Sequence, residues 1–299
     1  VELRLGEATV QLPLSVSLLN KSAKGAVKAS NLPLANLANV LPVLRPFALD
    51  GAVTTDLAVS VASDAPPALT GSVDLAGIKA DVQLGQRDSQ PPLRISGVTG
   101  KLTFEEDSLL AKPLELKVAD QPFSLGAKVT GIKSANHALQ LALKSEKVAL
   151  DPLLASLVAG GVPALAGSSL EALQLALTYH KSARNGGTTI SIDTGTIAGL
   201  PLAAAKLSAD FALDEQNKPV QVTLKPSTLG IFGGTLSLQG GLSGDAASAQ
   251  VRGSGLDLTK IVSVASPQSK VKITGTLKSL NADVRGNKNS FGRSVSGPV

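Results

Sequence analysis

The stretch Gly253–Phe291, GSGLDLTKIVSVASPQSKVKITGTLKSLNADVRGNKNSF, contains the layout on which the rest of the chain is built. Leu256 and Leu258 alternate with polar residues and predict a short strand, and Thr259–Val264 predicts a short helix. After the helix, apolar residues recur mostly at every second position and predict a long amphipathic strand pair. These residues are Val271, Ile273, Leu277, Leu280, Ala282 and Val284.

The same layout occurs twice earlier in the chain, in Asn31–Val61 and Lys147–Tyr179. Each copy contains the pattern Leu-x-Leu-x-x-Leu, with Val or Ile at some positions, and a Leu/Ile-x-Gly sequence downstream. The start of this pattern lies 116 residues later in the second copy than in the first, and 108 residues later in the third than in the second. A repeat with a period of roughly 110 residues is typical of an extended, stacked architecture. The first pattern starts at Leu32, Val148 and Leu256, and the second ends at Gly51, Gly167 and Gly275.

The repeat predicts one continuous β body, residues 1–299, made of three units that short helices mark. The first helix would end near Pro42, because proline lacks a backbone donor and clashes with the preceding turn. The units cover about 1–146, 147–254 and 255–299, the last of them truncated. The expected helices are Leu34–Leu41, Pro152–Ala159 and Thr259–Val264.

Most other segments are runs of five to eight residues with period-two alternation, bounded by Gly, Pro, Asn, Asp or Ser. They predict a mostly β chain of antiparallel strands, each with one apolar and one solvated face. An early example is Val16-x-Leu18, which would lead into a polar turn at Asn20–Gly25.

The apolar faces need a partner, and two architectures supply one. Two sheets would pack into a sandwich, or one elongated antiparallel sheet would curl into a β-groove or gutter. Aromatic side chains normally fill the thick middle of a sandwich core, and they make up only 2% of this chain. The scarcity of aromatics and the repeat favour the groove, with the sandwich left open.

The composition bounds the possible functions. Hydrophobic residues make up 43% of the chain, and the formal charge of +5 is spread along the sequence. Such a diffuse excess, without stacking aromatics, does not indicate a nucleic-acid partner. The absence of Cys excludes disulfides, thiolate metal sites and cysteine nucleophiles.

The motifs of enzymes are also weak. Neither His137 nor His180 has Cys, His or carboxylates at ligand spacing, and no Gly-x-Ser-x-Gly elbow occurs. The acidic run Glu105–Asp107 is typical of a solvated turn. The glycine-rich stretch Gly230–Gly241 lacks the Lys and helix of a phosphate loop. We therefore expect no enzyme, no metal site and no cofactor.

The chain begins at Val1, contains no Met and alternates like a strand from its first residues, which predicts a piece of a longer protein. The longest uncharged stretch, Pro152–Leu170, contains Pro163 and a Gly-Gly pair, so we do not expect it to span a membrane.

The repeated Leu-x-Leu-x-x-Leu/Ile pattern with its short helix, the downstream Leu/Ile-x-Gly strand and the turn Gly230–Leu236 (GIFGGTL) resemble the AsmA-like family of Gram-negative envelope proteins. Gly230–Gly286 is most similar to the C-terminal region of that family. The resemblance implies an N-terminal inner-membrane anchor, absent from this chain, a periplasmic β-groove and a role in phospholipid movement between the membranes. It also implies possible envelope protein partners.

The main functional hypothesis is a periplasmic lipid-binding and lipid-transfer segment that shields the acyl chains of phospholipids, or of another lipid, in an apolar β-groove. One-sided apolar strands without enough helix to cover them are its motivation. The expected lining residues are the apolar members of the best-defined strands. They are Phe123, Leu125, Val129, Leu173, Leu175, Leu177, Phe211, Leu213, Leu236, Leu238, Val271 and Ile273.

The alternative is a structural or assembly adaptor of the cell envelope. A long open sheet has unpaired edges that accept a strand from a protein partner. The aromatic and Arg residues typical of interface hot spots are scarce in this sequence. That scarcity favours the lipid hypothesis over the adaptor.

Overall fold

A computed structural model describes most of the chain and divides it into two compact units. Unit 1 comprises Val1–Lys144 and Asp151–Val162, and unit 2 comprises Ser145–Leu150 and Pro163–Val299. The two units are described separately below. The described residues are 2–5, 8–19, 21–36, 48–63, 65–82, 92–134, 136–157, 167–197, 199–216, 218–265, 273–287 and 295–296.

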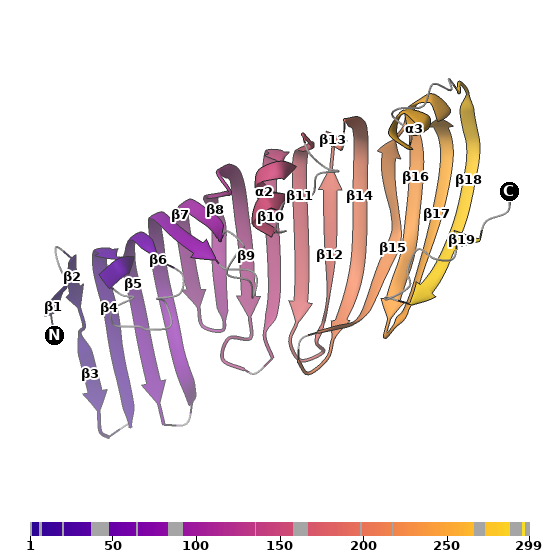
Figure 1. Cartoon of the computed structure of the whole chain (residues 1–299). Coiled ribbons are helices and arrows are strands. Elements are labelled where there is room, and N and C mark those ends of the chain that lie inside the picture. The colour runs from indigo at the N-terminus through magenta and orange to yellow at the C-terminus, as the bar shows by residue number, and fades with distance from the viewer. Residues whose placement is uncertain are drawn as a thin grey trace. The chain divides into compact units, whose positions relative to one another are not determined.

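Unit 1 is an antiparallel sheet in which strands that follow one another in sequence lie side by side (Figure 1). At its N-terminal edge, β2 and β3 both pair with β4, and β1 pairs with β2. The strands are β1 (Glu2–Leu5), β2 (Ala8–Gln11), β3 (Leu14–Ser17), β4 (Ser22–Pro33), β5 (Asp50–Ala62), β6 (Ala65–Val82), β7 (Leu93–Glu105), β8 (Ser108–Val118), β9 (Gln121–Thr130) and β10 (Ala138–Ala149), whose last residues belong to unit 2.

Unit 2 repeats this arrangement. Its first strand, β11, pairs with both β12 and β13, and these two pair with β14. From β14 onward each strand pairs with the next one in sequence. The strands are β11 (Ser169–His180), β12 (Asn185–Ile192), β13 (Thr194–Ile197), β14 (Leu200–Leu213), β15 (Pro219–Ile231), β16 (Gly234–Ser243), β17 (Ala246–Asp257), β18 (Thr276–Asn287) and β19 (Val295–Ser296).

Within each unit the described strands form a single layer, in which a strand meets its neighbours along paired edges (Figure 1). The mostly antiparallel β prediction is confirmed, and the sheet of each unit is open rather than part of a sandwich.

Short helices occur at all three expected places. The two helices with described bounds are α2 (Leu150–Leu157) and α3 (Leu258–Ala265). Helix α2 begins two residues before the predicted Pro152, because proline is tolerated in the first turn of a helix. Of the first predicted helix, Leu34–Leu41, residues 34–36 are helical, and the rest lies outside the described residues.

The residue two positions before each helix is buried. Leu32 has this position in the first copy of the repeat, Val148 is 0% exposed in the second and Leu256 is 1% exposed in the third. In the last two copies the N–H of the first helical residue also donates to a carbonyl just before the strand that follows the helix. The N–H of Leu150 donates to the carbonyl of Ser168 at 2.9 Å, and that of Leu258 to Gly275 at 3.0 Å. These two copies therefore share a local structure.

Two sequence predictions near turns are wrong. Over its described residues, from Ile273 to Val284, the predicted strand pair is a single strand, β18, which begins at Thr276. Gly275 has a φ of 144°, a conformation that L residues rarely adopt, and it separates Ile273 from the strand. Val271 lies outside the described residues. At the other end of the chain, β3 ends at Ser17, so Leu18 belongs to the turn and not to a strand.

Gly71 on β6 lies very close to the backbone of the neighbouring strand β5. Its φ is 123°, and a Cβ added there would lie 2.1 Å from the carbonyl oxygen of Asp56 on β5. Gly77, on the same strand, has a φ of 64° and no atom within 4 Å of an added Cβ. Substitution at these two positions separates steric clash from backbone strain.

We predict that Gly71→Ala destabilises unit 1 more than Gly77→Ala does. Both substitutions place Ala in the left-handed region, which costs about 1–2 kcal/mol. Only Gly71→Ala also forces the neighbouring strand to move, which adds about 1–3 kcal/mol. Urea unfolding followed by circular dichroism measures both free energies, and equal losses would contradict the strand contact.

Candidate functional site: an open apolar face in each unit

The strand register assigns each side chain to one face of the sheet, because directly opposite residues in an antiparallel pair point to the same side. In unit 1 one continuous row of cross-strand partners runs from β4 to β10 and is made of apolar residues and one glycine. We call the side that carries this row the apolar face of unit 1. Its members are Val27, Leu57, Gly71, Phe104, Leu109, Val129 and Leu139.

Unit 2 carries an equivalent row from β11 to β18, which defines its apolar face in the same way. A second row, one residue away along each strand, points to the opposite side and consists mainly of polar residues. The apolar row contains Leu177, Thr188, Ala209, Leu224, Gly240, Ala249 and Val284. The polar row contains Thr178, Gly187, Asp210, Thr223, Gly241, Ser248 and Arg285.

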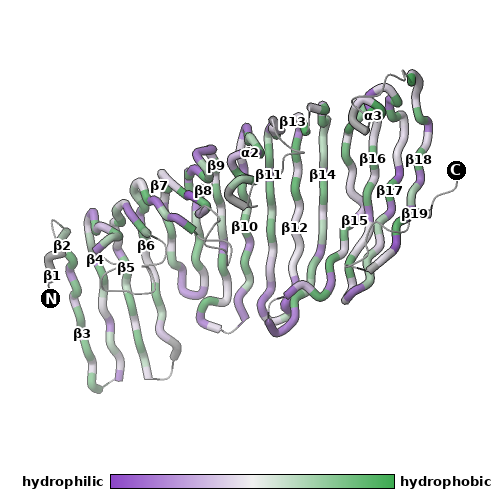
Figure 2. Tube along the Cα trace, viewed as in Figure 1, coloured by the Kyte–Doolittle hydropathy of each residue, from purple (hydrophilic) through white to green (hydrophobic). Residues whose placement is uncertain are grey.

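Side chains on the apolar face are mostly half-buried. On β11, Leu173, Leu175 and Leu177 are half-buried, while Gln174 and Ala176 between them are exposed. Figure 2 shows the corresponding alternation of hydrophobic and hydrophilic residues along the strands. Over the described residues of each unit, no second sheet lies against the apolar face. Neighbouring side chains of this face bury part of each other's surface, and the remaining apolar surface is accessible to solvent or to a ligand.

Two threonines on the apolar faces, Thr55 and Thr188, place their hydroxyl groups against the backbone. Thr55 Oγ1 donates to the carbonyl of Val27 at 3.3 Å in unit 1. Thr188 Oγ1 donates to the carbonyl of Ala176 at 3.2 Å in unit 2. Because both hydroxyl protons are used within the sheet, the two threonines present mainly their methyl groups to the apolar face.

The polar face carries cross-strand ion pairs. Lys28 lies directly opposite Asp56, with Nζ 3.3 Å from Oδ2, and Lys101 lies opposite Asp74 at 3.9 Å. The Lys79 Nζ lies 3.5 Å from Asp50 Oδ2. The pKa of Asp50 is lowered by the backbone N–H of Gly51 and then by Lys79. These exposed pairs hold neighbouring strands in one register.

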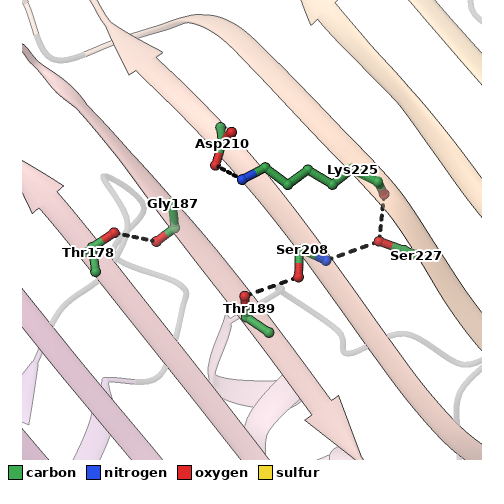
Figure 3. Close-up of polar contacts among 7 residues, drawn as sticks. All are labelled: Thr178, Gly187, Thr189, Ser208, Asp210, Lys225 and Ser227. Carbon is green, nitrogen blue, oxygen red and sulfur yellow. Dashed lines mark hydrogen bonds and ion pairs between the residues drawn. The ribbon is translucent and has the colours of Figure 1, made fainter.

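Pro226 interrupts the ladder between β14 and β15, since it has no N–H to donate, and the register shifts there. The buried Ser227 replaces the lost bond: its Oγ accepts from the N–H of Ser208 at 3.0 Å and donates to the carbonyl of Lys225 at 2.8 Å (Figure 3). Beside it, Lys225 Nζ lies 2.8 Å from Asp210 Oδ1. Ser227 thus supplies two hydrogen bonds at this bulge, and bulges typically bend the strand that carries them.

The structure places most of the predicted lining residues on the two apolar faces. Phe123 lies opposite Leu116 and is buried, so it contributes packing rather than open surface. Ile273 precedes β18 and does not belong to the sheet, and Val271 lies outside the described residues. The remaining predicted residues are half-buried strand residues: Leu125 and Val129 in unit 1, and Leu173, Leu175, Leu177, Phe211, Leu213, Leu236 and Leu238 in unit 2.

Several residues of the apolar faces are missing from the prediction. Several of them follow the same period-two alternation, as in Leu57-x-Val59-x-Val61, so the signal was present in the sequence. Register now groups them with the predicted residues. They include Leu57, Phe104 and Leu109 in unit 1, and Ile190, Leu224, Leu242 and Val284 in unit 2.

A hollow of about 550 Å³ also lies in unit 2, with a wall of mixed polar and apolar residues. Its charged and hydroxyl side chains include Glu171, Thr194 and Lys260, and glycines form much of the rest of its wall. Thr194 Oγ1 donates to Glu171 Oε2 at 2.9 Å. Glu171 and Lys260 distinguish this hollow from the rows of the apolar faces, which contain no charged residue.

The described residues contain no group of three or more His, Cys, Asp or Glu placed to hold a metal ion. None of their helices has the length and apolar character needed to cross a membrane. His137 lies in a loop, with Nδ1 2.7 Å from the carbonyl oxygen of Gly131.

Comparison with known proteins does not identify the chain. No family model, curated protein or solved structure matches it. Its function is therefore inferred from its own residues.

Because the chain contains no Cys, single cysteines can report the two faces directly. We predict that a thiol in Gln174→Cys reacts several-fold faster with a water-soluble maleimide than one in Leu175→Cys. The first position is exposed and the second is half-buried on the apolar face. A bimane attached at Leu175→Cys should also emit at shorter wavelength. Equal labelling rates and spectra in folded variants would show that the register, and with it the apolar face, is wrongly assigned.

Proposed function

We propose that the chain is a periplasmic lipid-transfer segment whose apolar faces shield acyl chains of phospholipids on their way between the inner and outer membranes. The observation that carries the proposal is the open apolar face of each unit, which no second sheet covers among the described residues. The proposal involves no catalysis and no cofactor.

The energetic argument concerns the acyl chain in water. Each methylene exposed to water costs about 0.8 kcal/mol, so a chain of ordinary length costs on the order of 10 kcal/mol. A surface of Leu, Val, Ile and Ala side chains removes much of this cost when the acyl chain lies along it. The half-buried residues of the sheet lose water-exposed area in the same step, so both partners gain.

The dimensions of one unit are sufficient. Neighbouring strands lie about 4.8 Å apart, so the row from Leu177 on β11 to Val284 on β18 crosses seven strands over about 30 Å. One leaflet of a bilayer has a hydrocarbon thickness of about 15 Å. The apolar face of unit 2 therefore offers more than the length of one acyl chain.

The chemistry of the face favours movement of a bound lipid over tight recognition. The apolar faces carry mainly aliphatic side chains and glycine, with Phe104 and with Thr55 and Thr188, whose hydroxyl protons bond the backbone. Such a surface binds by burial and dispersion, which are not directional. A lipid that meets no strong polar contact along the row can slide from one strand to the next.

The cellular setting of the proposal rests on the resemblance to the AsmA-like family. That resemblance supports a periplasmic location and an inner-membrane anchor outside this chain. It also makes phospholipid the first lipid to test.

The direct test is native mass spectrometry of the purified protein, followed by extraction and identification of bound lipid. We expect phospholipid to co-purify under mild conditions and to transfer between donor and acceptor vesicles. Absence of lipid would contradict the proposal. Saturable binding of one envelope protein in place of lipid would instead support the adaptor alternative.

We predict that Leu175→Asp and Leu238→Asp lose most lipid carriage, because each places a charge on the apolar face, where burial against hydrocarbon is strongly disfavoured. The matched controls are Gln174→Asp and Ser237→Asp, adjacent residues that point to the polar face. Each pair shares the same strand and the same added charge. Circular dichroism checks the fold, and wild-type transfer by the folded Leu variants would remove the proposal.

A further inference from the structure

The tip of the β3–β4 hairpin exposes two leucines. Leu18 is 90% exposed and Leu19 is 97% exposed. Leu14 and Val16 on β3 are 72% and 60% exposed, so the apolar stretch continues from the strand into the turn. In Figure 2 the tube of β3 is hydrophobic down to this end.

Other hairpin turns in the described chain have a different composition. The turn between β7 and β8 contains Glu106 and Asp107, and that between β16 and β17 contains Gly244 and Asp245. Turns favour such residues because they face water and adopt special backbone conformations. Two adjacent leucines in a fully exposed turn form a contact surface rather than a solvated loop.

The charge around this tip is one-sided. The sequence from Ala8 to Leu49 contains four basic residues and no Asp or Glu. Two of the basic residues, Lys21 and Lys24, are exposed in and beside the turn. Lys28 lies further along β4 and pairs with Asp56. The tip thus combines exposed apolar side chains with two exposed lysines.

We propose that this hairpin docks the protein on an anionic lipid surface. Leu18 and Leu19 enter the boundary between headgroups and acyl chains, and Lys21 and Lys24 lie among the lipid phosphates. A membrane interface offers both environments within one side-chain length, and basic residues add to binding at anionic surfaces.

The hairpin also connects this contact to the apolar face of unit 1. Leu14 lies opposite Gly25 and Val16 opposite Ala23, and Gly25 and Ala23 in turn lie opposite Val59 and Val61 on β5. Membrane docking does not depend on lipid carriage by the faces. A variant with a charge on the apolar face of unit 2, such as Leu238→Asp, should still dock.

The first experiment is co-sedimentation with vesicles of phosphatidylglycerol and phosphatidylcholine in equal parts, compared with phosphatidylcholine alone. We expect binding to the anionic vesicles that falls as salt rises. The double variant Leu18→Ser/Leu19→Ser should bind at least tenfold more weakly. Its matched control is Val220→Ser/Ile273→Ser, which removes two apolar residues that are each 42% exposed in unit 2.

The charge is tested by Lys21→Gln/Lys24→Gln, which should lower binding to anionic vesicles on the order of tenfold. Its control, Lys128→Gln/Lys144→Gln, removes two exposed lysines from β9 and β10 and should bind like the wild type.

The second experiment uses the absence of Trp from the chain. Leu19→Trp introduces a single reporter at the tip, and Val220→Trp introduces one elsewhere. On anionic vesicles the emission of Leu19→Trp should shift to shorter wavelength and be quenched by brominated acyl chains, while Val220→Trp should not respond.

Three results would overturn the proposal: no binding of the wild type to anionic vesicles, unchanged binding of Leu18→Ser/Leu19→Ser, or an unquenched Leu19→Trp. Loss of self-association in the leucine variant, without vesicle binding by the wild type, would assign the tip to a protein contact instead. Failure of lipid co-purification with normal docking would count against the lipid-transfer function alone.

Discussion

The structure depends on strand register. In a single-layered sheet a slip of one residue moves every apolar side chain to the solvated face. The ion pair of Lys28 with Asp56 and that of Lys101 with Asp74 join residues that are directly opposite, so a slip would separate the charges or place them on the apolar face. An exposed pair contributes at most about 1 kcal/mol. Its larger effect is to raise the free energy of the slipped alternatives.

In these single-layered sheets the most deeply buried side chains lie near the ends of the strands. The middle of the strands is half-buried, and the most deeply buried apolar side chains, Val148 and Leu256, lie just before the short helices. In unit 2 a further cluster forms around Leu170, Ile192 and Leu202. Because a strand contacts mainly its two neighbours, its stability is set by nearest-neighbour terms, as in repeat proteins. The open faces are therefore supported from the ends of the strands.

Much of the fold could be predicted from the sequence, and each wrong prediction has a specific physical cause. Period-two alternation identified strands such as those that carry Leu175 and Leu236, and the scarcity of aromatics favoured an open sheet over a sandwich. Alternation did not reveal the bulge at Pro226 or the role of Ser227, because both depend on the register of the partner strand. It also placed Leu18 in a strand, since a pattern cannot show where a turn begins. The conformation of Gly275 likewise ended the predicted strand that contained Ile273.

Pairing between consecutive strands in an open layer has a consequence for how such a chain can change in length. In a closed barrel the number of strands, their tilt and the shear are linked, so adding a strand alters the whole structure. The sheets of units 1 and 2 have no such closure condition. A hairpin such as β8–β9, whose two strands pair with each other and with β7 and β10, could be duplicated or deleted while every other register is kept. Insertion or deletion of hairpins in the sequence can therefore change the number of strands in each unit without rebuilding the rest of its sheet.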